Sequence, residues 1–259
     1  MRRGNGQAKG AGLERRSGDA RAAGEPAARR VFHELKSAIV TMALTPGQDL
    51  SENEIAVRIG VSRQPVREAF IKLSEAGLVR IRPQRGTFVV KISTKQVTDA
   101  RFVREAVEVA VARKACEVMS AEALADLRRI IDAQRVAAVE AVPARFLALD
   151  EAFHRGLALG VDCDYAWRVV EEVKAQMDRV RYLSLPQATP ISRLVEQHAA
   201  ILDAVEAGDE GRAEAAVRAH LSEILTSLPM LERQFPHLFE SEEEVEPAAA
   251  PQALETAGA

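Results

Sequence analysis

The chain has 259 residues, of which 47% are hydrophobic, 28% charged and 4% aromatic, and its formal net charge is −3. This length suggests two domains, each large enough to bury a core. No apolar run approaches the ~18 residues of a membrane span, and no apolar stretch follows the first arginines, so we expect a cytoplasmic chain without a membrane partner. The only two cysteines, Cys116 and Cys163, lie far apart, which excludes a disulfide scaffold.

The near-neutral total hides an uneven distribution of charge. Residues 1–30 carry eight basic and three acidic side chains and residues 31–93 carry nine and six, so together they have a net charge of +8, against −11 for the rest. Residues 1–30, rich in Gly, Ala and Arg, are predicted to be a disordered basic tail. Residues 236–259, with six Glu and no Lys or Arg, are predicted to be a disordered acidic tail. The basic front half points to a nucleic-acid partner.

The pattern of residues 31–93 predicts three helices followed by a hairpin. The first helix shows apolar residues at four-residue spacing. The second begins at the capping box Ser51-Glu-Asn-Glu54 and ends at Gly60, which suits a left-handed terminal residue. The third is predicted to run from a cap at Ser62 to about Ala76.

The second and third helices are separated by Gly-Val-Ser, which is the spacing of a helix-turn-helix. Arg63, Gln64 and Arg67 project together from the start of the third helix. Arginine can bond guanine, and glutamine adenine, with two hydrogen bonds each, so this face suits the major groove of DNA. The alternative is a small helical domain whose arginines are ordinary solvated surface.

Residues 78–90 alternate apolar and basic side chains around the turn Pro-Gln-Arg-Gly86 and are predicted to form a β-hairpin. A hairpin directly after the third helix would act as a wing. Arg85 and Gly86 at its tip would reach the DNA backbone or minor groove, where glycine allows close approach of the main chain.

Residues 94–235 contain few helix breakers and are predicted to form an all-helical bundle of six or seven helices. Asp150 and His154 lie one turn apart on a helix that starts after Pro143, so both side chains leave the same face. An ion pair on that face is the alternative to a metal-ligating role.

Two further histidines flank the turn at Gly208. His198 lies ten residues before this glycine and His220 twelve after it, so in an antiparallel helix pair both rings lie roughly 15–18 Å from the turn and face each other. Three imidazoles with the carboxylate of Asp150 would suit a divalent transition metal. Partly exposed helical histidines are the alternative.

Three segments of the front block carry a family resemblance: Leu50-Ser-Glu-Asn-Glu-Ile-Ala56, Gly60-Val-Ser-Arg-Gln-Pro-Val-Arg-Glu-Ala69, and the wing from Leu78 to Gly86-Thr-Phe-Val. They resemble the DNA-binding domain of the GntR family of bacterial transcription regulators. The resemblance implies operator contacts by Ser62, Arg63, Gln64, Arg67, Arg85 and Gly86. Asn53 is a further candidate, at a position where the family commonly has an arginine.

Residues 96–232 are similar to the ligand-binding domain (FCD domain) of the FadR-type branch of that family. The resemblance implies a helical bundle with a small carboxylate effector on or beside a metal ion, whose ligands would be Asp150, His154, His198 and His220. Arg104 aligns with a family arginine close to this pocket and is the candidate effector anchor. A surface ion pair of Arg104 with Glu108 is the alternative, and Arg179 and Arg181 are weaker candidate anchors.

These patterns predict a mainly α protein. Residues 31–93 would form a winged helix-turn-helix domain, and residues 94–235 a helical domain for effector binding, metal binding and dimerisation. We expect a homodimeric transcription regulator, a repressor or an activator, on pseudo-palindromic double-stranded operator DNA. A small organic acid would control it, together with a divalent transition metal, Zn²⁺ ahead of Ni²⁺ and Mn²⁺. A metal-sensing regulator and a metal-dependent enzyme are the alternatives, and no catalytic residue is predicted.

Overall fold

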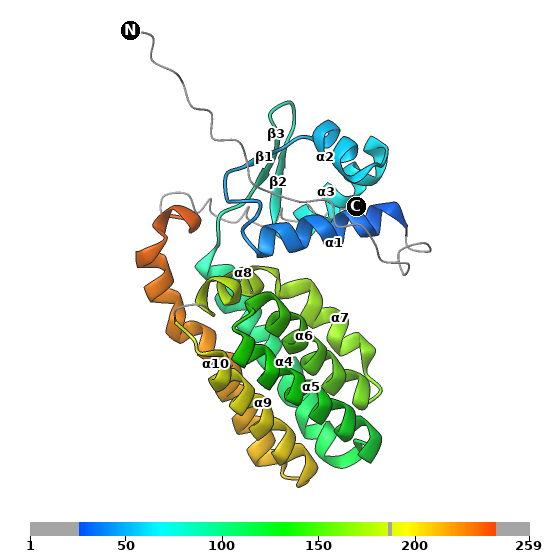
Figure 1. Cartoon of the computed structure of the whole chain (residues 1–259), viewed down its shortest axis with the longest axis vertical. Coiled ribbons are helices and arrows are strands. Elements are labelled where there is room, and N and C mark those ends of the chain that lie inside the picture. Colours follow the sequence, from blue (N-terminus) through cyan, green and yellow to red (C-terminus); the bar gives the residue numbers. More distant parts are fainter. Residues whose placement is uncertain (1–25, 186–187, 242–259) are drawn as a thin grey trace, which may run out of the picture.

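The structure is a computed structural model that describes residues 26–185 and 188–241. A small domain containing a three-stranded sheet lies against one end of a helical bundle (Figure 1). Most of both predicted tails lies outside the described residues. Within them, the first helix already begins at Ala27 and residues 236–241 belong to the fold, so both tail boundaries differ from the prediction.

The N-terminal domain contains the three predicted helices and the predicted hairpin. A two-residue strand that the sequence analysis did not predict pairs with the hairpin, so that the antiparallel sheet has the order β1-β3-β2. The elements are α1 (Ala27–Val40), β1 (Asp49–Leu50), α2 (Glu52–Ile59), α3 (Arg63–Glu75), β2 (Val79–Arg82) and β3 (Gly86–Val89).

Local signals set the ends of α2 and α3. The Ser51 hydroxyl accepts the Glu54 backbone N–H at 3.4 Å, as the capping box predicts. Gly60 ends α2 at φ 77°, in the left-handed region. Ser62 stands at the N-cap position of α3, but its hydroxyl makes no capping hydrogen bond.

The bundle consists of seven helices in the part of the chain that the structure describes, within the six or seven predicted. The predicted antiparallel pair around Gly208 is formed by the last two, and the Asp209 carboxylate caps the second of them through the Arg212 N–H at 3.0 Å. The helices are α4 (Thr94–Val118), α5 (Ala121–Glu140), α6 (Pro143–Gly160), α7 (Asp164–Val173), α8 (Ala175–Ser184), α9 (Ile191–Glu206) and α10 (Glu210–Gln234).

Helix α8 lies at the junction of the two domains (Figure 1). Ala175, its first residue, packs into the hydrophobic core of the N-terminal domain. One residue later, Gln176 Nε2 donates to the backbone carbonyl of Gly77, just beyond the end of α3, at 2.7 Å. Met177 and Val180 of α8 pack in a buried cluster with residues of α4 and α10, so this short helix contacts both domains.

The end of the described chain returns to the same junction. After a short 3-10 helix (Pro236–Leu238), Phe239 forms a parallel bridge with Ile92, which lies in the connection between β3 and α4. The Ile92 N–H donates to the Leu238 carbonyl at 2.8 Å, and its carbonyl accepts the Glu240 N–H at 2.9 Å. The connection between the domains is therefore held from both sides of its backbone.

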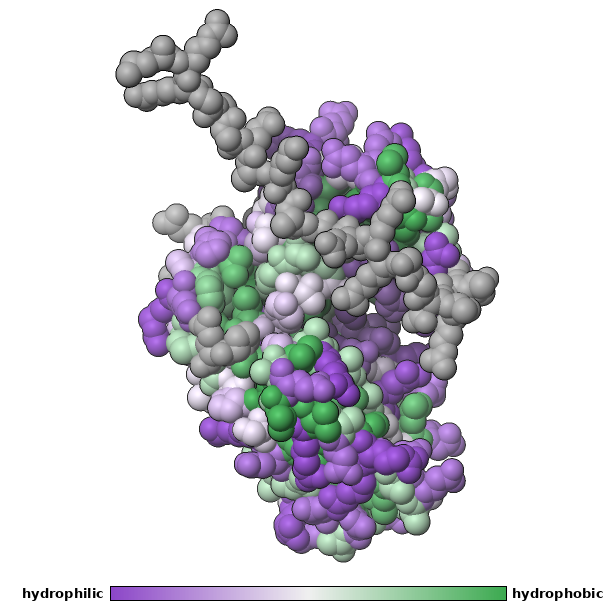
Figure 2. All heavy atoms as spheres, viewed as in Figure 1, coloured by the Kyte–Doolittle hydropathy of each residue, from purple (hydrophilic) through white to green (hydrophobic). Residues whose placement is uncertain are grey.

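No described helix is both long and apolar enough to cross a lipid bilayer. In the space-filling view the free end of the bundle is mostly hydrophilic, with hydrophobic surface restricted to smaller areas (Figure 2).

Candidate metal centre and nucleic-acid interface

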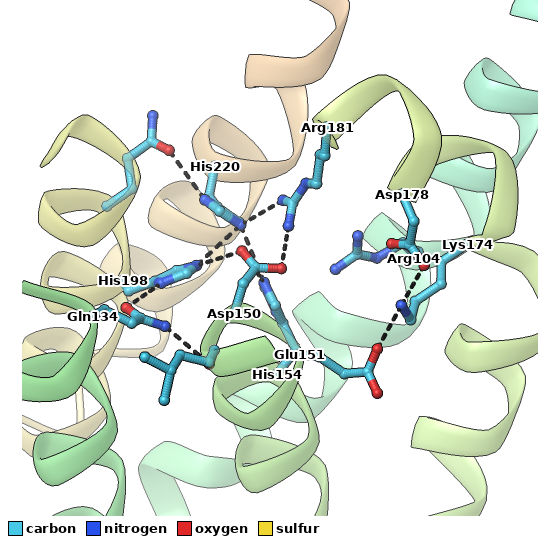
Figure 3. A network of polar contacts seen from close by, with 12 residues as sticks. Arg104, Gln134, Asp150, Glu151, His154, Lys174, Asp178, Arg181, His198 and His220 are labelled. Atoms are coloured by element: carbon cyan, nitrogen blue, oxygen red, sulfur yellow. Dashed lines mark hydrogen bonds and ion pairs between the residues drawn. The ribbon is translucent and has the colours of Figure 1, made fainter. Parts of the chain in front are cut away.

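Four side chains from three helices of the bundle meet at one buried place, the His–Asp cluster (Figure 3). α6 supplies Asp150 and His154, α9 supplies His198 and α10 supplies His220, and each is at most 6% exposed. Their potential ligand atoms all lie within 4.8 Å of one another. The Nε2 atoms of His198 and His220 are 3.3 Å apart, so these rings face each other as the register of the helix pair predicts.

The outer nitrogen of His198 is held by a glutamine. Its Nδ1 lies 2.8 Å from Oε1 of Gln134, whose own Nε2 donates to the backbone carbonyl of Leu149 at 3.0 Å. Because the amide nitrogen is engaged with a carbonyl, the amide oxygen must be the group that faces His198. The Nδ1 of His198 therefore carries the hydrogen, and its Nε2 lone pair is directed into the cluster.

A second glutamine holds His220 in the same way. The Nδ1 of His220 lies 3.0 Å from Oε1 of Gln197, and Gln197 Nε2 donates to Oε2 of Glu223 at 3.0 Å. The carboxylate accepts only, which fixes the amide orientation. The Nε2 of His220 is thus a second lone pair directed inward.

The third histidine has a carboxylate behind it. Glu108 Oε2 lies 2.6 Å from Nδ1 of His154 as a close ion-pair contact, without the angle of a hydrogen bond. Glu108 Oε1 accepts from Nε of Arg104 at 2.6 Å. Arg104 is only 2% exposed, so the Arg104–Glu108 ion pair, which the sequence analysis gives as a surface alternative to an effector anchor, forms but is buried behind His154.

Three imidazole Nε2 atoms and one carboxylate therefore converge. Asp150 Oδ1, buried in the cluster, has no hydrogen-bond partner among the described residues. Arg181 is the one cationic side chain in the described part of the chain that reaches these converging acceptors, and it leaves Asp150 Oδ1 without a partner. Ligating histidines characteristically donate their other ring N–H to a carbonyl or carboxylate oxygen. This donor set fits a divalent transition metal.

Arg181 of α8 also reaches the cluster. Its guanidinium donates to Asp150 Oδ2, and its Nη2 lies 3.0 Å from Nε2 of His220. The sequence analysis ranks Arg181 below Arg104 as an anion anchor, whereas the structure places Arg181 at the cluster and Arg104 one residue behind it. Arg179 is buried beside Gln176, away from the cluster.

Burial sets the charge of the cluster. It lowers the pKa of His198 to about 3, and with the neighbouring positive groups it lowers that of His220 well below its ordinary value. Burial alone would raise the pKa of Asp150, but Arg181, with His154 and His198, outweighs it and lowers this pKa to about 2. His198 and His220 are thus neutral near pH 7 while Asp150 is ionised, the forms in which these groups ligate metals.

The candidate DNA contacts lie on the surface of the N-terminal domain, and all of them are exposed: Asn53, Ser62, Arg63, Gln64, Arg67, Arg85 and Gly86. The wing turn brings Arg85 to the tip of the hairpin between β2 and β3. Gly86 has φ 102°, and a Cβ there would lie 2.9 Å from Asp49 Oδ1. This glycine is therefore required by the hairpin itself, whether or not DNA approaches it.

An acidic residue that the sequence analysis did not single out contacts the arginines. Glu52, the first residue of α2, accepts from Arg63 Nη2 at 3.0 Å and from Nε and Nη2 of Arg67 at 3.2 and 3.1 Å. Gln64 Nε2 similarly donates to Oε1 of Glu68 at 3.0 Å. The three candidate base-reading side chains are thus each paired with a carboxylate.

A winged helix-turn-helix with an exposed, basic face at the start of its third helix is the architecture of a DNA-binding transcription regulator. Residues 27–89 match the family model described as bacterial regulatory proteins, gntR family, and residues 99–223 match that of the FCD domain. The HTH-type transcriptional repressor RspR of Escherichia coli K12 is 40% identical over 218 residues, which cover 84% of this chain and 96% of that protein. The chain belongs to the GntR family of regulators and carries an FCD domain.

More distant relatives agree with this assignment. The gluconate operon transcriptional repressor of Bacillus subtilis is 26% identical over 185 residues, covering 70% of this chain and 76% of that protein. The solved structure of E. coli McbR/YncC has the same fold, with a TM-score of 0.70 at 18% identity, covering 82% of this chain and 99% of that one. The chain is accordingly a DNA-binding transcription regulator rather than an enzyme.

Proposed function

We propose that this regulator binds a pseudo-palindromic operator as a homodimer, and that a divalent metal ion and a small organic acid at the His–Asp cluster control its operator affinity. The convergence of three Nε2 lone pairs and Asp150 Oδ1 on one buried point carries the metal half of this proposal. The exposed polar start of α3 supports the DNA half. The repressor names of its relatives favour repression.

In the DNA complex, α3 would lie in the major groove and the wing beside it. Arg63, Gln64 and Arg67 would contact base edges, while Ser62 and Arg85 would contact phosphates. The two remaining assignments are weaker, because Gly86 has a structural role and Asn53 is shorter than the arginine that the family commonly has at this position. Two protomers would place two such helices in successive major grooves.

In the bundle, Asp150, His154, His198 and His220 would hold the ion, with Zn²⁺ ahead of Ni²⁺ and Mn²⁺. When bound, the ion would offer open coordination positions to a carboxylate from solution. Arg181 is the cationic side chain best placed to hold the other end of that carboxylate, because its guanidinium already contacts Asp150. Arg104 would act through Glu108 and His154.

Helix α8 supplies a physical link between the two sites. Arg181 near its C-terminal end contacts the cluster, and Gln176 near its start donates a hydrogen bond to the backbone carbonyl of Gly77, two residues beyond α3. Lys174, just before α8, lies between two carboxylates (Figure 3). It forms ion pairs with Glu151 of α6 at 2.9 Å and with Asp178 of α8 at 2.5 Å, and so links the two helices. A ligand that draws Arg181 away from Asp150 would therefore shift the helix on which the DNA-binding domain rests.

The DNA half is tested with Arg63→Ala and Arg67→Ala. Each variant should bind duplexes selected from a random-sequence pool by the wild-type protein more weakly by about fivefold or more, because a bidentate arginine–guanine pair contributes about 1–3 kcal/mol. Thermal unfolding should show an intact bundle. Unchanged binding by both variants would contradict the assignment of α3.

The metal half is tested by elemental analysis and thermal shift. Wild-type protein should retain about one divalent ion per chain after dialysis, and His198→Ala should retain none. A screen of small organic acids, with and without chelator, should then raise the unfolding temperature only in the metal-loaded protein. If operator affinity responds to the metal and to no acid, the protein is a metal-sensing regulator.

A further inference from the structure

The contact of Glu52 with both arginines of α3 joins residues 11 and 15 positions apart in the chain. Its carboxylate reaches from the first turn of α2 to the first two turns of α3, and its side chain is 24% exposed, against 59% for Arg63 and 55% for Arg67. These arginines lower the pKa of Glu52, Arg67 most strongly. The ionised carboxylate of Glu52 thus lies among the side chains that would face the negatively charged DNA.

The way Glu52 holds Arg67 leaves a defined edge of the guanidinium free. The two carboxylate oxygens take Nε and one hydrogen of Nη2. The remaining edge, made of Nη1 and the outer hydrogen of Nη2, points away from the carboxylate because the guanidinium is planar. That edge presents two parallel donors, which is the pattern that matches O6 and N7 of guanine.

Glu52 also changes the energetics of the two arginines. Like charges four residues apart on a helix repel each other, and a free arginine loses rotamer entropy when it is fixed. A carboxylate between the two guanidiniums offsets the repulsion and restricts their rotamers before DNA arrives. The same negative charge weakens attraction to phosphate, which is independent of sequence.

We propose that Glu52 is a positioning residue for operator discrimination: it orients Arg63 and Arg67 for base contacts and lowers affinity for DNA in general. This inference rests on the proposed DNA-binding role of α3. Glu52 itself would contact no base, and its effect would be measured as the ratio of affinities for a selected and an unselected duplex.

The test compares Glu52→Gln with Glu75→Gln, a matched control at the opposite end of α3. Both variants remove one negative charge, but only Glu52 touches the arginines. Affinities are measured for the tightest duplex selected by the wild-type protein and for a scrambled duplex of equal length and composition. Glu52→Gln should lower the affinity ratio by about fivefold or more, within the 1–3 kcal/mol of a bidentate pair, while Glu75→Gln leaves the ratio unchanged.

A double-variant cycle separates positioning from a general effect on stability. If Glu52 acts through Arg67, Glu52→Gln should cause a smaller loss of discrimination in an Arg67→Ala background than in the wild type, because only Arg63 then remains for Glu52 to orient. Additive losses, or equal ratios for Glu52→Gln and Glu75→Gln, would overturn this inference alone. A wild-type protein that enriches no duplex would overturn the proposed function, and the inference with it. Thermal unfolding of each variant checks that α2 remains folded.

Discussion

Gln134 touches no candidate DNA contact and donates no ligand atom, yet its amide oxygen decides which nitrogen of His198 faces the cluster. Gln134→Leu would remove that acceptor and leave the Nδ1–H of His198 buried without a partner. We expect the affinity for Zn²⁺ to fall about 10–100-fold, as measured by competition with a chromophoric chelator. Gln96→Leu, on the exposed side of α4, is the control. Equal Zn²⁺ affinity for both variants would contradict the role given to Gln134.

The depressed pKa of His198 predicts the acid sensitivity of the metal-free protein. In the unfolded chain this histidine has an ordinary pKa of about 6.5, whereas burial lowers it to about 3 in the fold. Between these values the unfolded state binds more protons, so the free energy of unfolding should fall as the pH drops below about 6.5, by up to about 1.4 kcal/mol per pH unit for one histidine.

Urea unfolding with chelator at pH 7.5, 6.5 and 5.5 measures this effect. That range lies above the window in which Asp150 would add its own contribution, because a carboxylate with a lowered pKa loses stability only as the pH falls through about 4 toward 2. His198→Gln should show a smaller loss on acidification. An unchanged pH dependence would mean that another group carries it.

At the scale of elements, α8 is the part of the bundle through which the two sites would communicate. Gln176→Ala removes its hydrogen bond to the Gly77 carbonyl and leaves the His–Asp cluster intact. We expect the variant to bind Zn²⁺ as the wild type does. In coupled proteins a ligand typically changes the affinity at the other site by about 5–150-fold, and in this variant the change in operator affinity caused by the ligand should be close to none. Arg168→Ala, exposed on α7, is the control. Full retention of coupling would exclude this route.

The elements themselves were predictable where their signals are local. The Ser51 capping box, Gly60 and Asp209 each act within a few residues, so the ends of α2 and the start of α10 follow from the sequence. β1 has two residues, too few for any periodicity, and forms only because β3 is there to pair with it. α7 and α8 meet at Lys174 without Gly or Pro between them, so no local signal in the sequence marks the boundary between these two helices.

The same distinction applies to the candidate site. The cluster was predictable because two helices joined by a short turn have a fixed register, which brings His198 opposite His220. The supporting residues were not. Gln134 and Glu108 reach the histidines from other helices, and a glutamine or glutamate on a helix face carries no local mark of its tertiary partner.

At the scale of the whole molecule, the uneven charge predicts strong salt dependence of operator binding. A dimer contacting several phosphates should lose about a thousandfold in affinity between 50 and 200 mM salt. Arg85→Ala, at the tip of the wing, should reduce the slope of log affinity against log salt by about one unit for each bound protomer. Titrations at four salt concentrations measure the slopes for the wild type and for Arg85→Ala. Identical slopes would mean that Arg85 of the wing does not contact the DNA backbone.

The backbone bridge between Ile92 and Phe239 imposes an order on biosynthesis. The helices and strands of the N-terminal domain end at Val89, but its hydrophobic core also contains Ala175 of α8, so its packing is complete only once α8 has been translated. The hydrogen bonds that fix its connection to α4 require Leu238 and Glu240, which are translated after all seven helices of the bundle. This fastening of the DNA-binding domain to the bundle is therefore possible only once Glu240 has been translated.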